Sequence, residues 1–266
     1  MKRSAFALLL PALLLLVASV PAFADEWSKT YNVSGTPDLR VETSDANIRV
    51  TTWDQRTIQA KVISNRYKIG EGGIHIEEHQ TGDAVSIAVR YPHHGINIEW
   101  GPHRVDILIQ MPREGKLNLQ TDDGKIEVAG LKGEMNLHSG DGSETLDGVD
   151  GKLHATTGDG HIHANGRFDE LDLKTGDGHV EVQASSGSSI ATGWHLETGD
   201  GNVTLDVPSQ LAADVDLHTG DGHIDLDMPV TTAGKVRENE VRGKLNGGGS
   251  LLLIHTGDGS IHLGKS

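Results

Sequence analysis

The stretch "LDLKTGDGHVEV" at residues 171–182 contains one repeat unit of this chain. Leu171 and Leu173 alternate with polar residues before the tetrapeptide Thr-Gly-Asp-Gly, and Val180 and Val182 alternate with polar residues after it. Alternation with a period of two is typical of β-strands that bury one face. The stretch therefore predicts two short strands joined by a tight corner, with the polar residues between the apolar ones pointing outward.

The same corner recurs along the chain. It reads TSDA at 43–46, TDDG at 121–124 and SGDG at 139–142, and it reads TGDG in five later copies. The central aspartates are Asp45, Asp123, Asp141, Asp159, Asp177, Asp200, Asp221 and Asp258. The first regular steps are 18 residues long, and a fixed period near 20 residues indicates a solenoid. We predict an all-β fold, a parallel β-solenoid or β-helix of about 18-residue coils with TGDG corners, stacked ~4.8 Å apart.

The corner residues suggest turn chemistry. Glycine supplies positive φ at little steric cost, aspartate can bond its own backbone N–H groups in an Asx turn, and the threonine hydroxyl can satisfy a corner amide. We therefore interpret the aspartate column as structural corners. One copy departs from the pattern, because Glu144 stands where other copies have Ile or Val. This substitution predicts a loose or distorted coil.

The repeat also divides the chain. Residues 25–118 alternate without the regular corner, which predicts irregular β-rich N-terminal coils or a cap. Residues 119–266 predict the regular β-solenoid repeats, with insertions near 184–195 and 230–250, where the spacing lengthens. We expect the two parts to form one continuous domain.

Residues 1–24 have the build of a signal peptide. Lys2 and Arg3 precede an apolar run, and Ala22-Phe23-Ala24 forms a small-residue cleavage pattern. The chain has no cysteine, so we expect neither disulfides nor a lipid on cysteine. We predict an exported protein that is periplasmic, cell-surface or secreted, with no transmembrane segment after signal cleavage. With 23 basic and 38 acidic residues, this acidic protein should repel nucleic acid.

Three stretches carry a resemblance to a known family. They are "VETSDANIRVTTWD" at 41–54, "VDILIQMPREGKLNLQTDDGKIEVAGLKGEMNLHSGDG" at 105–142 and "LNGGGSLLLIHTGDGSIHL" at 245–263. With the TGDG repeats, they resemble the bacterial "putative adhesin" family of unknown function, which has β-strand repeats. The resemblance implies a right-handed or roll-like β-solenoid on an exported protein. It brings no catalytic residues with it.

Histidines and corner aspartates raise the alternative of cation binding. His161 and His179 follow corner glycines on neighbouring coils, and His163 lies beside Glu181, so these four side chains could bind zinc, copper or nickel. Repeat duplication of outward polar residues explains the same pattern without a metal. Calcium is suggested by the Gly-Asp-Gly corners, although only one corner of each coil carries them. We expect no cofactor, and keep a cation-binding (Ca or Zn) solenoid as the alternative.

No catalytic motif is present. The chain lacks Gly-x-Ser-x-Gly, a Walker loop, His-Glu-x-x-His and a cysteine nucleophile. Its Asp and His residues recur at equivalent positions, whereas a catalytic site is one constellation. We predict a non-catalytic adhesin, envelope scaffold or binding protein rather than an enzyme. A polysaccharide-active β-helix is the less favoured alternative, which rests on fold analogy alone.

The candidate contact surface lies in "YPHHGINIEWGPHR" at 91–104. Aromatic residues and arginine are favoured at recognition sites, and this segment supplies Tyr91, His93, His94, Trp100 and Arg104. The alternative is a cap that packs its aromatic rings over the first coil. The expected partner is an envelope or extracellular protein or glycan, and open solenoid ends also predict end-to-end self-association.

Overall fold

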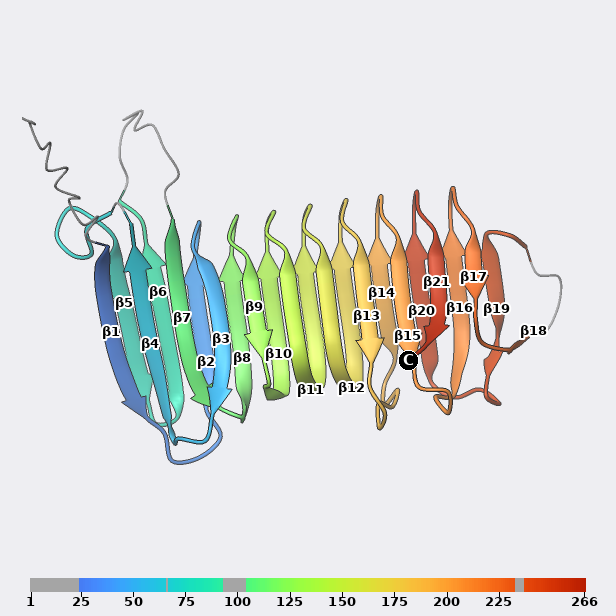
Figure 1. Cartoon of the computed structure of the whole chain (residues 1–266), viewed down its shortest axis with the longest axis horizontal. Coiled ribbons are helices and arrows are strands. Elements are labelled where there is room, and N and C mark those ends of the chain that lie inside the picture. Colours follow the sequence, from blue (N-terminus) through green and yellow to red (C-terminus); the bar gives the residue numbers. More distant parts are fainter. Residues whose placement is uncertain (1–23, 66, 93–103, 233–236) are drawn as a thin grey trace, which may run out of the picture.

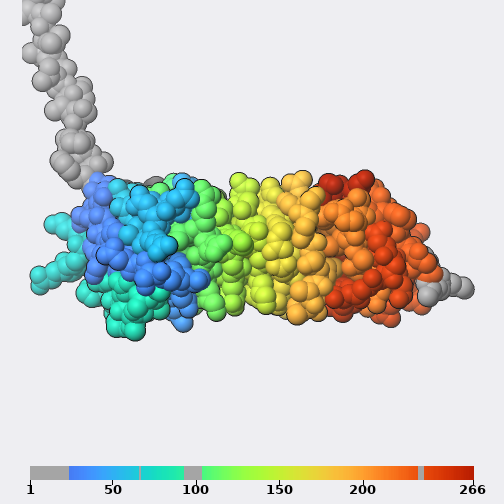
Figure 2. All heavy atoms as spheres, turned by 90° about the horizontal axis from the view of Figure 1, so that it is seen from below, coloured from blue at the N-terminus to red at the C-terminus, as the bar shows by residue number. Residues whose placement is uncertain are grey.

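The computed structural model describes residues 24–65, 67–92, 104–232 and 237–266. This part of the chain is all-β, with twenty-one strands and no helix. The strands lie side by side in a long stack (Figure 1), and the view from below shows the same elongated shape (Figure 2). Nearly all of the expected signal segment lies outside the described residues. The stack has two long faces, A and B, which enclose the core between them.

Face A joins twelve strands or half-strands, which are parallel except at the two ends. In spatial order they are β5 (His75–Thr81), β6 (Ala84–Arg90), β2 (Asp38–Thr43), β8 (Glu114–Thr121), β10 (Lys132–Ser139), the second halves of β11 (Glu144–Thr157) and β12 (Ile162–Thr175), β14 (Trp194–Thr198), β20 (Leu251–Thr256), β16 (Ala213–Thr219), β19 (Glu240–Leu245) and β18 (Val230–Thr232).

Face B is built in the same way. In spatial order it contains β1 (Asp25–Asn32), β4 (Thr57–Ser64), β7 (Val105–Pro112), β3 (Asn47–Trp53), β9 (Ile126–Ala129), the first halves of β11 and β12, β13 (Val180–Ala184), β15 (Val203–Val207), β21 (Ile261–Lys265) and β17 (Ile224–Leu226). A coil is one strand of face A, a corner, and the next strand on face B. The narrow corners follow the upper edge of Figure 1.

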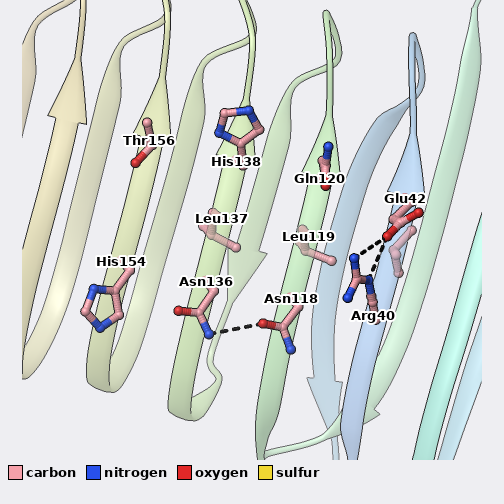
Figure 3. A pocket seen from close by; sticks show the side chains of 11 residues that line it. Arg40, Glu42, Asn118, Leu119, Gln120, Asn136, Leu137, His138, His154 and Thr156 are labelled. Atoms are coloured by element: carbon pink, nitrogen blue, oxygen red, sulfur yellow. Dashed lines mark hydrogen bonds and ion pairs between the residues drawn. The ribbon is translucent and has the colours of Figure 1, made fainter.

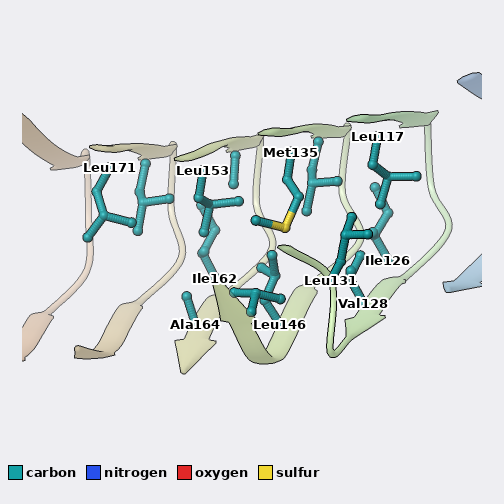
Figure 4. Close-up of a cluster of buried hydrophobic side chains, with 14 of the residues drawn as sticks. Leu117, Ile126, Val128, Leu131, Met135, Leu146, Leu153, Ile162, Ala164 and Leu171 are labelled. Atoms are coloured by element: carbon teal, nitrogen blue, oxygen red, sulfur yellow. The ribbon is translucent and has the colours of Figure 1, made fainter. Parts of the chain in front are cut away.

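The core consists of columns of inward side chains. Leu117 pairs with Met135, Met135 with Leu153, and Leu153 with Leu171, so residues 18 apart occupy the same place on successive coils. All four side chains are buried (Figure 4). Burial of each such side chain contributes about 1.5–3 kcal/mol. The apolar alternation of the sequence thus fixes which side of every strand faces the core.

Two coils lie out of chain order. The coil of β2 and β3 lies between the strands β6 and β7 and the coil of β8 and β9. At the other end, the coil of β20 and β21 lies between the coil of β14 and β15 and the coil of β16 and β17. The corner of Asp258 therefore lies between those of Asp200 and Asp221. The lengthened spacing near the C-terminal end reflects this insertion as well as loops.

A ladder of hydroxyl groups runs through the corners. Thr157 Oγ1 donates to the carbonyl of Gly142 on the preceding coil at 2.9 Å and accepts the N–H of Gly160 at 3.2 Å. The bond from hydroxyl to corner amide is thus present as expected. The same donor role is held by Thr121, Ser139, Thr175, Thr198, Thr256 and Thr219. The ladder stops at Thr43, whose buried hydroxyl bonds no backbone group of a neighbouring coil among the described residues.

The corner glycines serve close stacking. The expectation of positive φ was wrong, because no glycine of the TGDG copies has one. A Cβ built on Gly178 would lie 1.9 Å from the carbonyl oxygen of Gly160, and one on Gly160 would lie 2.2 Å from that of Gly142. The backbones of neighbouring coils therefore approach too closely for any side chain. Glycine is therefore required at these positions because the backbone of the neighbouring coil leaves no room for a side chain, and not because of the backbone angles of the turn.

Glu144 fits the coil without distorting it. It pairs in register with Ile126 and Ile162 on the neighbouring coils, and its side chain is fully buried. The predicted distortion of this coil is present, but it lies further along β11 than Glu144, with register shifts between Leu146 and Val149 and between Gly151 and Lys152. Neither carboxylate oxygen has a hydrogen-bond partner, and burial raises the pKa of Glu144 to about 8. Burial of this carboxyl group therefore carries an electrostatic cost in the free energy of folding.

The expected insertions stay close to the stack. Residues 185–193 lie along β12, to which Ser185 and Ser189 donate backbone hydrogen bonds. The segment 230–250 supplies β18 and β19, which pair antiparallel and cover the edge of β16. At the opposite end, Glu78 of β5 accepts a hydrogen bond from Tyr31 of β1 at 3.1 Å and joins face A to face B. Polar contacts thus close the end of the core.

Candidate functional site

The predicted metal-binding histidines form a stacked pair on the surface. The rings of His161 and His179 lie 5.0 Å apart, with an angle of 4° between their planes. His161 Nδ1 accepts the backbone N–H of His179 at 2.9 Å, and His179 Nδ1 accepts that of Asn202 at 2.9 Å. A neutral imidazole has one acceptor nitrogen. Both acceptors are therefore occupied by the next coil, and the ring protons lie on Nε2.

Other residue types take the same role in this column. Asn47 Oδ1 accepts the N–H of Lys125 at 3.1 Å, Ser143 Oγ accepts that of His161 at 3.3 Å, and Asn202 Oδ1 accepts that of Ser260 at 2.8 Å. The common property is an acceptor within reach of the next coil's amide. Histidine at this position is thus explained by hydrogen bonding between coils.

The remaining two predicted ligands form an ion pair. His163 Nδ1 lies 3.3 Å from Glu181 Oε2 across neighbouring coils. Within the residues that the structure describes, no group of three His, Asp or Glu side chains has the geometry to hold a metal ion. The hypothesis of zinc or calcium binding stays a prediction.

The corner aspartates form a row along one edge of the stack. Their spatial order is Asp45, Asp123, Asp141, Asp159, Asp177, Asp200, Asp258 and Asp221. The expected Asx turns are absent, because no side-chain hydrogen bond of Asp141 or its later counterparts is found at the described corners. Their backbone N–H groups donate to the neighbouring coil instead, as Asp177 does to Gly158 at 3.2 Å. The carboxylates are left free for solvent or ligands.

At the beginning of this row, the carboxylates influence one another. Burial and the neighbouring charges of Asp123 and Asp122 raise the pKa of Asp45 above its ordinary value. Like charges thus repel one another at this beginning of the row.

The predicted contact surface is divided between the two faces. Tyr91 directly follows β6 and packs edge-to-face on Tyr67 with 5.7 Å between ring centroids, so its ring belongs to the core packing. Burial raises the pKa of Tyr91. Arg104 precedes β7 on face B and binds Asp106 through Nε at 2.8 Å. His93, His94 and Trp100 lie outside the described residues.

Face A carries a shallow groove that the sequence did not reveal. A hollow of about 240 Å³ crosses β2, β8, β10 and the second half of β11 (Figure 3). Its polar side chains are Arg40, Glu42, Asn118, Gln120, Asn136, His138, His154 and Thr156. Most of them belong to two outward columns in which residues 18 apart repeat. That spacing was the available signal, since planar polar side chains recur at 118, 136 and 154.

The groove contains one hydrogen bond between coils and one within a strand. Asn136 Nδ2 donates to Asn118 Oδ1 at 3.1 Å, and Arg40 Nε donates to Glu42 Oε1 at 2.7 Å. The amide ladder still has free donor and acceptor positions directed outward. The groove continues into a second hollow of about 350 Å³ over β6 and β5. The small outward side chains Ser86 and Ala88 contribute to its lining.

Comparison with protein families identifies the chain. The model of Toastrack DUF4097 matches residues 29–191 and 164–264, which together include nearly all of the described strands. The chain belongs to the Toastrack DUF4097 family. The resemblance to a bacterial family of unknown function with β-strand repeats is thereby confirmed. The all-β architecture agrees with a solenoid-like Toastrack protein.

Three solved structures are similar to this Toastrack chain. A "putative cell adhesion protein" from Clostridium sporogenes is 14% identical, with a TM-score of 0.46 and coverage of 92% of this chain and 100% of that one. A "putative adhesin" from Parabacteroides merdae is 9% identical, with a TM-score of 0.43 and coverage of 90% and 96%. A "Putative lipid binding protein" from Parabacteroides distasonis is 10% identical, with a TM-score of 0.33 and coverage of 90% and 96%.

Two further observations concern curated proteins and membrane-spanning helices. No curated protein matches this Toastrack chain. In the described ranges, no helix has the length and apolar character needed to cross a membrane.

Proposed function

We propose that this Toastrack protein is an exported, non-catalytic binding scaffold of the adhesin type. Its frame is a parallel β-solenoid of about 18-residue coils with TGDG corners, and its binding surface is the groove of face A. The observation that carries the proposal is the form of this groove, which is open and crosses several neighbouring coils. Its lining repeats from coil to coil and does not converge on one point.

The groove suits an extended polar partner. Coils rise ~4.8 Å apart, which is close to the length of one sugar ring in an extended polysaccharide. Asn118, Asn136 and His138 offer donors and acceptors along this direction. An envelope or extracellular glycan, or an extended protein segment, could therefore bind several coils at once.

The recurrent polar groups support a binding role without catalysis. The corner hydroxyls and the imidazoles of His161 and His179 are occupied by hydrogen bonds between coils. A general acid or base would need a free group aimed at one substrate position. This scaffold therefore presents a repeated surface to its partner. The polysaccharide-active enzyme would instead require convergent acidic groups.

Capture from cell-envelope fractions tests the groove. The immobilised full-length mature protein should retain a partner, and the triple variant Asn118→Ala, Asn136→Ala and His138→Ala should lose most of it. The matched control is Asp216→Ala, His218→Ala and His255→Ala, which changes the same face at the far end of the stack. Equal capture by wild type and both variants would contradict binding in the groove. Circular dichroism checks that each variant is folded.

Cation binding is the second candidate, favoured by one observation. From Asp141 onward the corner carboxylates have no side-chain hydrogen bond at the described corners, and at Asp45 the like charges of Asp123 and Asp122 contribute to a raised pKa, so a divalent cation would relieve the repulsion there. Binding to the folded state alone would raise the melting temperature, and the rise would grow with the logarithm of the ligand concentration once that concentration exceeds Kd. Melting curves with calcium, zinc and chelator test this, and unchanged curves with both ions would remove the candidate.

Export and assembly are part of the proposal. Mass spectrometry of the protein from whole cells should give a mature chain beginning at Asp25, and fractionation should place it in the periplasm, on the surface or in the medium. A full-length chain with an uncleaved N-terminus in the cytoplasm would contradict export. End-to-end association should appear as concentration-dependent sedimentation, while a single species at all concentrations would contradict it.

A further inference from the structure

Basic side chains gather around a hollow on face B. This hollow of about 380 Å³ is lined by Arg49, Arg104 and Lys125 together with Asp106 and Glu127. We propose that it is a second binding site, which takes the carboxylate or phosphate group of an acidic polysaccharide. The inference is independent of the groove on face A, because the two hollows share no residue.

The strand register brings the three cations together. Arg49 of β3 is paired with Leu108 of β7 on one side and with Glu127 of β9 on the other. Arg104 directly precedes β7, and Lys125 directly precedes β9. Three neighbouring strands thus deliver one cation each to the same part of face B. The convergence depends on the insertion of the coil of β2 and β3 between β7 and β9.

The cations retain donors for a ligand. Arg49 donates to Glu127 through Nε at 2.5 Å, and Arg104 donates to Asp106 through Nε at 2.8 Å. Across the described residues, no Nη group of either arginine donates a hydrogen bond, and the ammonium of Lys125 has no ion pair. A guanidinium edge and an ammonium are suited to carboxylate and phosphate oxygens. The two acids hold the arginines in place without occupying these donors.

Part of the floor of the hollow is apolar. Ile63 and Leu108 lie beneath the charged rim and are half-buried. Their side chains offer a surface for the C–H face of a sugar ring, while the rim binds the acidic substituent. A second hollow of about 440 Å³ shares Arg49 and Leu108 and extends toward Gln59 and Lys61. The surface therefore has room for more than one sugar unit.

The charge of the whole protein gives this site its selectivity. Residues 25–132 contain 13 basic and 16 acidic residues, whereas residues 133–266 contain 8 basic and 22 acidic ones. An anionic chain is repelled by the second part and is directed toward the first. Glu26, Asp106 and Glu127 flank the two hollows, so a flat anionic bilayer would meet repulsion at their rims. A narrow polysaccharide chain can place its acidic groups on the cations of the hollow, where Glu127 and Asp106 are already paired with Arg49 and Arg104.

Titration calorimetry with polygalacturonate tests the site, with neutral dextran as the comparison polymer. We expect binding of polygalacturonate alone, weakened at least about tenfold in the triple variant Arg49→Gln, Arg104→Gln and Lys125→Gln. The affinity should also fall with added salt. The control variant, Lys132→Gln, Lys152→Gln and Lys174→Gln, removes three positive charges from face A and should bind within about twofold of wild type.

Two results with the polymer would overturn the proposal. They are the absence of polygalacturonate binding by the wild type, whether or not phosphatidylglycerol vesicles bind, and an equal loss in both triple variants. Inorganic phosphate as a competitor separates recognition of the acidic group from recognition of the chain. Displacement of the polymer by phosphate supports a site for the acidic group, whereas no displacement at any concentration counts against it. Thermal melts show whether each variant folds, and Arg49→Lys, which keeps the charge, provides a milder test.

Discussion

The N-terminal coils, residues 25–132, and the regular stack that follows them use polar side chains in different ways. In the stack, hydroxyl, imidazole and amide groups repeat from coil to coil and bind the neighbouring backbone. Around the N-terminal coils, side chains from parallel and antiparallel strands line hollows on both faces, and the groove of face A crosses from these coils into the first coils of the stack. Repeated polar groups therefore hold the stack together, and the hollows that we propose as binding surfaces lie toward its N-terminal end.

Glycine substitution should give the largest difference between the two regions. Gly178→Ala places a Cβ 1.9 Å from the backbone of the next coil, whereas Gly82→Ala meets no atom within 4 Å and strains only a turn with φ of +60°. We expect a loss of about 5 kcal/mol for Gly178→Ala and about 1 kcal/mol for Gly82→Ala. Urea unfolding followed by circular dichroism measures both. Similar losses would show that stacking does not require the corner glycine.

Replacement of Glu144 should reveal the charge inside the stack. Burial raises its pKa from the ordinary value of 4.5 to about 8. This residue therefore lowers the free energy of unfolding of the wild type increasingly as the pH rises from about 4.5 to about 8. Glu144→Ile should therefore gain a few kcal/mol over wild type above pH 8, and this gain should shrink toward acidic pH. Unfolding at pH 4, 6 and 9 measures the difference. A gain that is independent of pH would mean that the carboxyl does not titrate in the fold.

The hydroxyl ladder offers a matched pair of substitutions. Thr175→Val removes a donor to the carbonyl of Gly160 and an acceptor for the amide of Gly178, which should cost about 2–3 kcal/mol. Thr43→Val removes a buried hydroxyl that bonds no backbone group of a neighbouring coil and interacts only with the Tyr91 hydroxyl, so we expect a loss below about 1 kcal/mol. Thermal and urea unfolding of the two variants tests the contrast. A comparable loss for Thr43→Val would place an unseen partner at the beginning of the ladder.

Aspartate substitution should give the smallest effects. Asp83 in the N-terminal coils accepts backbone hydrogen bonds from Ser34 at 2.6 Å and Gly35 at 2.9 Å, and these bonds lower its pKa. Asp83→Asn should lower the melting temperature by ~2 °C. Asp177→Asn should cause no loss, with a slight gain at low salt because a like charge leaves the row. Calorimetric melts at two salt concentrations measure both. A large loss for Asp177→Asn would give the corner carboxylate a structural role.

The fold could be predicted from the sequence wherever the signal is local. Leu171, Leu173, Val180 and Val182 are all buried as the alternation indicated, because a strand's two sides are set by its own residues. The position of the coil of β20 and β21 could not be predicted in this way. Its partners are distant in the sequence, and periodicity does not say which coil is the neighbour.

The candidate sites could be predicted from the sequence less well than the fold. The role of Gly178 depends on the carbonyl of Gly160, so only the stacked coils show why a side chain is excluded. The basic hollow was missed for the same reason, since Arg49 and Arg104 are far apart in the chain and meet through strand pairing. The aromatic signal at Tyr91 was real but marked packing against Tyr67.

The insertion of the coil of β20 and β21 has a consequence for the order of folding. The coils before and after it in space, β14 with β15 and β16 with β17, are both synthesised earlier and have no direct pairing with each other in the described structure. They can join only through a segment that follows both of them in the chain, and contacts of such long sequence separation form slowly. This end of the stack can therefore close only after that segment has been synthesised. We propose that the protein is exported, and this delay would keep that end of the chain unfolded while it passes through a translocation channel.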